Sequence, residues 1–116
     1  EDILKIAVCD LSGIDNSKKH FFSKWNGKAS ITVSGDLYLD FMESSVTKGK
    51  AMHQLQQYFG LSEDECMAFG DNYNDIDMLK SVKYAYVMDT ACEDIKKYAY
   101  DTTEWVEGTL RKEFNI

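Results

Sequence analysis

The sequence of 116 residues lacks several features that would each indicate a particular class of protein. It contains no proline, no internal repeat and no low-complexity tract. No apolar run approaches the roughly 18 residues needed to cross a membrane, and no signal peptide is recognisable. We therefore expect a cytoplasmic protein that has no membrane partner.

Cysteine is scarce as well. Only Cys9, Cys66 and Cys92 are present, and no pair has the Cys-x-x-Cys spacing of a zinc or redox site. An odd number argues against a disulfide framework, and a reducing compartment keeps such thiols free. Because Cys9 and Cys66 lie within apolar runs, the sequence predicts that both are buried free thiols.

Basic residues are outnumbered, with 13 lysines and arginines against 20 aspartates and glutamates, for a net charge of −7. Such a surface repels nucleic acid and anionic membranes, so neither is expected as a partner. It also repels phosphorylated molecules, so a phosphate site in this protein would need a cation. Hydrophobic residues make up 44% of the chain, enough for one compact domain or two small lobes.

Residues 1–43 have the element order of an α+β lobe. The pattern predicts a strand over 3–9, a helix over 15–25, and two strands over 31–33 and 37–41. Ser34-Gly35-Asp36 separates the last two strands and is typical of a hairpin turn, because glycine tolerates a positive φ.

Residues 44–116 instead alternate helices with strands. Strands are expected at 66–69, 84–88 and 100–102, and helices at 47–60, 75–81, 91–99 and 104–113. The runs at 66–69 and 84–88 are apolar without alternation, which is typical of strands buried on both faces of a parallel sheet. This order predicts an α/β fold with a doubly wound, Rossmann-like parallel sheet.

The first of these helices has clear boundaries. Thr47 is a good N-cap, and Gly60 is a typical C-terminal stop. Its apolar residues recur at helical spacing and predict one apolar face, made of Ala51, Met52, Leu55, Tyr58 and Phe59.

Two carboxylates, Asp71 and Asp75, closely follow the strand at 66–69. Ligands of open α/β sheets bind beyond the carboxyl ends of the strands, so a site is expected here. We expect Gly70 to let the backbone turn sharply as it leaves the sheet. Mg²⁺ typically takes one or two carboxylates together with waters and a substrate phosphate. The spacing therefore predicts a magnesium site at Asp71 and Asp75.

Two simpler interpretations of this segment are weaker. Asp71 and Asp75 could cap a turn and a helix, but caps do not account for the whole Gly-Asp-Asn-x-Asn-Asp string after a buried strand. An EF-hand calcium loop is excluded. Counting from Asp71 puts Tyr73, Ile76 and Val82 where that loop needs a ligand, a glycine and a bidentate carboxylate.

Lys48 lies at the expected start of a helix, 23 residues before Asp71. A cation there is unfavourable in the field of the helix dipole, which makes its presence informative. An ammonium group that points into a cleft can bind phosphate as a point charge and offset nearby carboxylates. Taken alone, Lys48 would be interpreted as a surface lysine, as Lys50 is.

From about Val46 onward, the sequence resembles the haloacid dehalogenase superfamily, specifically its Cof-type sugar-phosphatase branch. The residues that carry the resemblance are Thr47-Lys48-Gly49, Gly-Asp-Asn-x-Asn-Asp-x-x-Met-Leu at 70–79, and Tyr86-Val87-Met88. The resemblance implies a Mg²⁺-dependent phosphatase that acts on a small phosphorylated metabolite. It implies that Lys48 contacts the phosphoryl group and the nucleophile, and that Asp71 ligates Mg²⁺. It also implies that Asn74 approaches the phosphate and that Asp75 supports the metal or the lysine.

Two departures from the family pattern matter. Met88-Asp89-Thr90-Ala91 stands where the family usually has Met-Gly-Asn-Ala, so a contact made through that asparagine is not carried over. The family's nucleophile lies in an N-terminal Asp-x-Asp-Gly-Thr segment, which is absent here, and Asp10-Leu11-Ser12-Gly13 lacks the second aspartate. We therefore expect a C-terminal fragment that is inactive alone. Residues 1–43 would be a remnant of the α+β cap, and 44–116 the C-terminal half of the core sheet.

Two rival hypotheses remain at this point. The chain could be a non-catalytic binding module that self-associates or pairs with its missing half, because half a sheet leaves an apolar edge uncovered. A receiver-like signalling domain is weaker, because a receiver needs its acidic pair early in the chain. His20 and His53 lack metal-ligand spacing and are not expected in the site.

Overall fold

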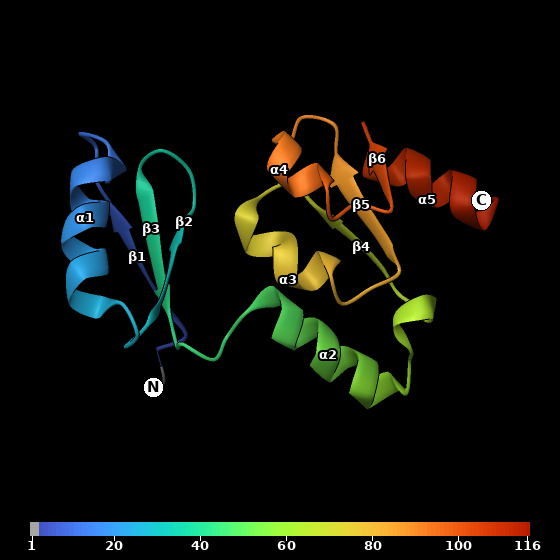
Figure 1. Cartoon of the computed structure of the whole chain (residues 1–116), viewed down its shortest axis with the longest axis horizontal. Coiled ribbons are helices and arrows are strands. Elements are labelled where there is room, and N and C mark those ends of the chain that lie inside the picture. The colour runs from blue at the N-terminus through green and yellow to red at the C-terminus, as the bar shows by residue number, and fades with distance from the viewer. Residues whose placement is uncertain (1–2) are drawn as a thin grey trace. The chain divides into compact units, whose positions relative to one another are not determined.

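A computed structural model describes residues 3–116 of the chain. The chain divides into two compact units, one that ends at Val46 and one that runs from Thr47 to Ile116 (Figure 1). No helix within residues 3–116 is both long and apolar enough to span a bilayer.

The first unit is a small antiparallel sheet with one helix. Its elements are β1 (Lys5–Cys9), α1 (Ile14–Trp25), β2 (Ser30–Val33) and β3 (Tyr38–Met42). The strands are arranged in the order β1-β3-β2, and α1 lies across one face of the sheet (Figure 1). Gly35, in the turn between β2 and β3, has a φ of 95°, which confirms the hairpin and the reason for a glycine there.

The core of the first unit lies between α1 and the sheet. Leu39 is fully buried, and Phe21 of α1 packs edge-on against Phe41 with ring centroids 5.2 Å apart. Cys9 pairs with Tyr38 in the register, on the sheet face opposite to that of Leu39. The prediction that Cys9 is buried is therefore wrong, because its side chain lies on the uncovered face.

The second unit is an α/β layer structure. Its helices are α2 (Lys48–Phe59), α3 (Ile76–Leu79), α4 (Glu93–Lys96) and α5 (Val106–Phe114), with short 3-10 helices η1 (Glu63–Glu65) and η2 (Tyr73–Asp75). Its strands are β4 (Met67–Gly70), β5 (Tyr84–Met88) and β6 (Asp101–Thr103). They pair in parallel in the order β4-β5-β6, which confirms the predicted α/β fold class and its parallel sheet.

The two faces of this sheet have different side chains. Ala68, Ala85 and Val87 are buried on one face, where they form a core with Leu79 and Ile95 of the helices. Small strand residues let the helices approach closely. Cys66, just before β4, is buried in the same core, as predicted.

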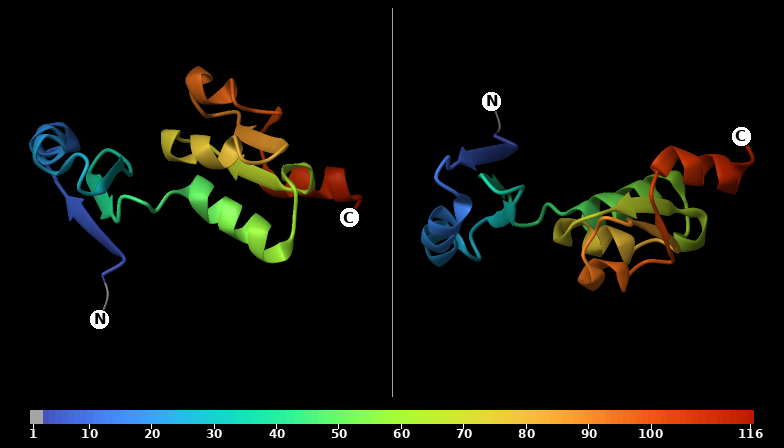
Figure 2. Two further views of the ribbon diagram at one scale, coloured as in Figure 1. Left: turned by 60° about the horizontal axis from the view of Figure 1, so that its bottom comes forward. Right: turned by 90° about the horizontal axis from the view of Figure 1, so that it is seen from above.

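The other face of the sheet is aromatic. Phe69 stacks on Tyr86 with ring centroids 5.4 Å apart, and Tyr100 meets Tyr86 edge-on. Burial of Tyr86, together with a hydrogen bond to Glu113 of α5, raises the pKa of its hydroxyl to about 12. In Figure 2, α4 and α5 lie on opposite sides of the strands. Because Phe69 is only half-buried, the prediction that β4 is buried on both faces is wrong.

Helix α2 differs from the prediction in the face that it buries. Leu55, Tyr58 and Phe59 are 53%, 82% and 64% exposed, whereas Gly49 and Gln56 are buried. The side-chain amide of Gln56 donates to the carbonyl of Ser81 at 2.7 Å, which fixes the helix against the segment after α3. Of the predicted apolar face, Met52 packs against the core, whereas Leu55, Tyr58 and Phe59 are uncovered in this structure.

The exposure of Leu55 gives a matched pair of substitutions. Leu79→Ala should lower the free energy of unfolding by about 2–5 kcal/mol, because Leu79 is 1% exposed and its loss leaves a cavity. Leu55→Ala should change it by less than about 0.5 kcal/mol. Urea unfolding followed by circular dichroism measures both. Equal losses for the two variants would mean that α2 packs through its apolar face after all.

Candidate functional site

The loop that follows β4 is organised around one buried carboxylate. Asp75 is 2% exposed, and its Oδ2 accepts the backbone N–H groups of Asp71 at 3.0 Å and Asn72 at 3.1 Å. The Asn72 side chain accepts the N–H of Tyr73 at 2.8 Å. These bonds fold residues 71–75 back on themselves, so η2 and α3 replace the single helix predicted over 75–81.

Lys48 reaches this carboxylate from α2. Thr47 caps the helix by accepting the N–H of Lys50 at 3.1 Å, so Lys48 is the first helical residue. Its ammonium forms an ion pair with Oδ1 of Asp75, 27 residues further along the chain. Both oxygens of Asp75 therefore have partners, and the Lys48 side chain remains 52% exposed.

The environment of Asp75 keeps it ionised. Burial raises the pKa of its carboxyl, but the hydrogen bond from Lys48 and those from the Asp71 and Asn72 amides outweigh burial. Together they hold the pKa of Asp75 below its usual value. A buried anion of this kind is stable only while its donors stay in place.

Glycine is needed at position 70 for a different reason from the one predicted. Gly70 does not have a positive φ, so a sharp turn is not what requires it. A Cβ added at Gly70 would lie 2.7 Å from Cβ and 3.1 Å from Cγ of Asp75. Because Gly70 has no side chain, the Asp75 carboxylate has room to pack against the end of β4.

The four predicted site residues fall into two pairs. Lys48 and Asp75 are in direct contact, as an ion pair. Asp71 and Asn74 lie in the same loop at the carboxyl end of β4, with exposed side chains. Their metal and phosphate roles stay predictions.

Asp71 and Asp75 differ in how well they suit a magnesium ion. The exposed carboxylate of Asp71 supplies the hard oxygen donors that Mg²⁺ prefers, and one carboxylate with waters and phosphate is a common set. Asp75 could act as a ligand only by exchanging one of its present partners for the ion. Within residues 3–116, no group of three or more acidic, histidine or cysteine side chains is arranged to hold a metal. Further ligands would therefore have to come from water, phosphate or another part of the protein.

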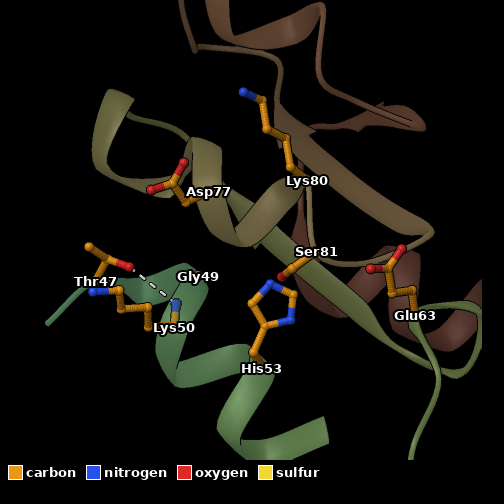
Figure 3. A pocket seen from close by; sticks show the side chains of 8 residues that line it. All are labelled: Thr47, Gly49, Lys50, His53, Glu63, Asp77, Lys80 and Ser81. Atoms are coloured by element: carbon orange, nitrogen blue, oxygen red, sulfur yellow. Dashed lines mark hydrogen bonds between the residues drawn. The ribbon is translucent and has the colours of Figure 1, made fainter. Parts of the chain in front are cut away.

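A groove of about 380 Å³ lies on another side of α2, and none of the four predicted site residues lines it. Figure 3 shows that His53 points toward Ser81 inside it, while the ammonium groups of Lys50 and Lys80 extend away from one another. Nδ1 of His53 lies 3.1 Å from Oε1 of Gln56, an acceptor, which makes Nδ1 the protonated nitrogen. His53 thus bonds within α2 and stands outside the candidate site.

Comparison with known proteins places this arrangement in a family. The family of haloacid dehalogenase-like hydrolases matches residues 1–108. The chain belongs to that family. This match confirms the resemblance to the haloacid dehalogenase superfamily that the Lys-Gly and Gly-Asp motifs carried.

The chain spans 27% and 37% of the length of the first two curated relatives that it matches, and 64% of the third. A Haemophilus influenzae protein with the provisional name of a phosphatase is 44% identical over 70 residues, which are 60% of this chain and 27% of that protein. An HMP-PP phosphatase of Escherichia coli is 30% identical over 95 residues, covering 81% of this chain and 37% of the relative. The structure of a HAD/COF-like hydrolase from Plasmodium vivax matches 97% of this chain and 42% of its own, with 22% identity and a TM-score of 0.86.

One contact of the loop that follows β4 was not predicted from the sequence. The thiol of Cys92, in the loop before α4, lies 3.5 Å from the hydroxyl of Tyr73 and joins that loop to the one that carries Asp71. This hydrogen bond raises the pKa of the Tyr73 hydroxyl. No spacing rule relates residues 73 and 92, so only the fold shows that they are neighbours.

The Lys48–Asp75 pair makes a testable contribution to stability. Lys48→Met should lower the free energy of unfolding at pH 7 by about 1–3 kcal/mol, because it leaves a buried carboxylate without its cation. The deficit should shrink as the pH falls below about 4, where the abandoned carboxyl can take up a proton. Urea unfolding at pH 7 and about pH 3.5, with EDTA present, measures it.

Lys50→Met is the matched control, because Lys50 lies two residues away on the same helix and is exposed. It should change the stability by less than about 0.5 kcal/mol at either pH. Equal deficits for the two variants would show that the ion pair contributes nothing specific.

Proposed function

We propose that this chain is the C-terminal part of a cytoplasmic, Mg²⁺-dependent phosphatase that hydrolyses small phosphomonoesters such as sugar phosphates. The observation that carries the proposal is the ion pair between Lys48 and the buried Asp75 at the carboxyl edge of β4, with exposed Asp71 beside it. Membership in a hydrolase family and a relative named HMP-PP phosphatase support the phosphatase class.

Lys48 and Asn74 would bind the transferred phosphoryl group. The Lys48 ammonium is half exposed while Asp75 fixes its position, so it can still donate hydrogen bonds to phosphoryl oxygens. The exposed amide of Asn74, one residue before Asp75, would donate to the same group. Asp75 acts mainly by holding Lys48 and the loop, since both of its oxygens are engaged.

Asp71 would hold Mg²⁺ together with waters and the substrate phosphate. When bound, the ion offsets the charge that otherwise separates acidic side chains from a phosphate dianion. Such an offset matters in a chain whose net charge is −7. The predicted participation of Asp75 as a second metal ligand is part of this proposal and would require it to release a present partner.

The nucleophile would come from a segment outside these 116 residues. An aspartate of that segment attacks phosphorus, the bond to the ester oxygen breaks, and the alcohol leaves with a proton. Water then attacks the aspartyl-phosphate, which releases inorganic phosphate and restores the carboxylate. Residues 1–43 would belong to the cap that selects the substrate, and residues 44–116 to the core.

The proposal is tested by a magnesium titration of turnover in the complete enzyme. Asp71→Ala should abolish Mg²⁺-dependent turnover because it removes a metal ligand. Lys48→Ala should lower the rate by about 10²–10³-fold, or about 3–4 kcal/mol, while leaving the magnesium dependence intact. Asp75→Asn should cost about 10–100-fold, as expected for a residue that supports the groups in contact with substrate.

Glu107→Ala is the control, since Glu107 is exposed on α5 and pairs within that helix with Arg111, and it should leave turnover unchanged. The 116-residue chain by itself should not hydrolyse p-nitrophenyl phosphate with Mg²⁺, because the proposed nucleophile lies in a segment outside it. Wild-type magnesium dependence in Asp71→Ala would refute the metal assignment. Turnover by the 116-residue chain that is lost in Asp71→Ala would refute the need for an outside nucleophile.

A second candidate function is a binding module that pairs with its missing half or with another copy. Among the strands that the structure describes, β4 pairs only with β5, so its other edge offers free backbone groups. Leu55, Tyr58 and Phe59 of α2 are exposed in the same unit. Apolar groups of this kind commonly mark a surface that another polypeptide covers.

Sedimentation velocity tests this second candidate. The chain should associate at micromolar concentration, and Leu55→Glu combined with Phe59→Glu should shift it to the monomer. Leu11→Glu, at an 86% exposed site of the first unit, should leave association unchanged. A wild-type chain that sediments as a monomer and binds no complementary half would exclude the module.

A further inference from the structure

Gly49 has no side chain at a point where α2 packs tightly against Asp77 of α3. A Cβ added at Gly49 would lie 2.6 Å from Cβ, 2.8 Å from the carbonyl carbon and 2.9 Å from the carbonyl oxygen of Asp77. Two of these three neighbours belong to the backbone, so a rotamer change in Asp77 could not make room. Figure 3 shows Gly49 on α2 facing the helix that carries Asp77. An alanine there would push the helices apart by about 1 Å, since carbon atoms normally pack about 3.5–4.0 Å apart.

The Lys48–Asp75 ion pair lies immediately beside this crossing point. Lys48 precedes Gly49 by one residue, and Asp75 precedes Asp77 by two. The spacing between the two helices therefore sets the distance that the lysine must bridge. A larger spacing moves the base of the Lys48 side chain away from its partner.

Asp75 cannot follow such a movement. Its Oδ2 is held by the Asp71 and Asn72 amides, and its Cβ and Cγ rest against Gly70. The carboxylate thus has a fixed position on the sheet side, and α2 is the movable partner. Gly70 sets the place of the carboxylate, and Gly49 sets the place of the ammonium.

We infer that Gly49 is a positioning residue. By allowing α2 to pack closely against α3, it places Lys48 where its ammonium can reach Asp75. The functional meaning of this inference rests on the proposed function, because it is there that Lys48 binds the phosphoryl group. Gly49 itself contacts no substrate. Its role is to allow the close helix crossing that a side chain would prevent.

A double-mutant cycle on the 116-residue chain tests this inference without any assay of turnover. With Gly49 present, Lys48→Met and Asp75→Asn should be coupled: the unfolding equilibrium constant of the double variant should differ about 3- to 10-fold from the product of the single effects. In the Gly49→Ala background, this coupling factor should fall to about one. Urea unfolding of the wild type and the seven variants of the two cycles supplies these equilibrium constants.

Gly108→Ala is the matched control. Gly108 lies in another helix, and an added Cβ there would meet ring atoms of Trp105, the nearest at 2.8 Å. The Lys48–Asp75 coupling should survive in that background. Sucrose at one fixed concentration in all samples keeps weakened variants folded.

Each outcome decides the inference. Loss of coupling in Gly49→Ala but not in Gly108→Ala supports a positioning role. A Gly49→Ala chain that is less stable yet keeps the coupling overturns it, because Gly49 would then serve packing alone. Gly49→Ala chains that fail to fold even in the Lys48→Met, Asp75→Asn background also overturn it, since the pair is already absent there. Because no turnover is measured, failure here leaves the proposed phosphatase activity untouched.

Discussion

The fold of the second unit depends on one buried carboxylate having enough hydrogen-bond and ion-pair partners. Asp75 is almost completely shielded from water, and an isolated charge in such a place would be strongly unfavourable. Three donors from two parts of the chain remove that penalty: one ammonium and two backbone amides. The same bonds shape the loop after β4, join it to the start of α2, and leave Asp71 and Asn74 facing solvent. The local fold and the candidate chemistry therefore share one electrostatic requirement.

The order of elements could be predicted from the sequence because it depends on local signals. Thr47 and Gly60 bound α2 as expected, and the apolar runs around β4 and β5 are parallel strands. The residues that belong to the candidate site could also be named, since they lie in two short motifs. That Lys48 would meet Asp75 across 27 residues could not be derived from spacing. Only the family resemblance suggested this contact, as one of two roles for Asp75, which were to support the metal or to support the lysine.

What the sequence could not show is which partner covers each surface. The spacing of Leu55, Tyr58 and Phe59 marks a genuine apolar face, but the structure buries the glycine and glutamine side of α2 instead. Cys9 lies in an apolar run and is nevertheless exposed, because its sheet has a helix on one face only. Gly70 shows the same limit. A sequence reveals that a side chain is missing, but only coordinates show that Asp75 fills the space.

The attachment of α5 has a consequence for how the molecule opens. Every residue of α5 is at least partly exposed, and its Glu113 lies near enough to Tyr86 of the sheet to help raise the pKa of the Tyr86 hydroxyl. The strands that it covers are by contrast centred on fully buried Val87. Local fluctuations should therefore release α5 as one cooperative segment, with amide protons that exchange much faster than those of β5. The aromatic face of the sheet would become transiently accessible while the loop that holds Asp75 stays closed.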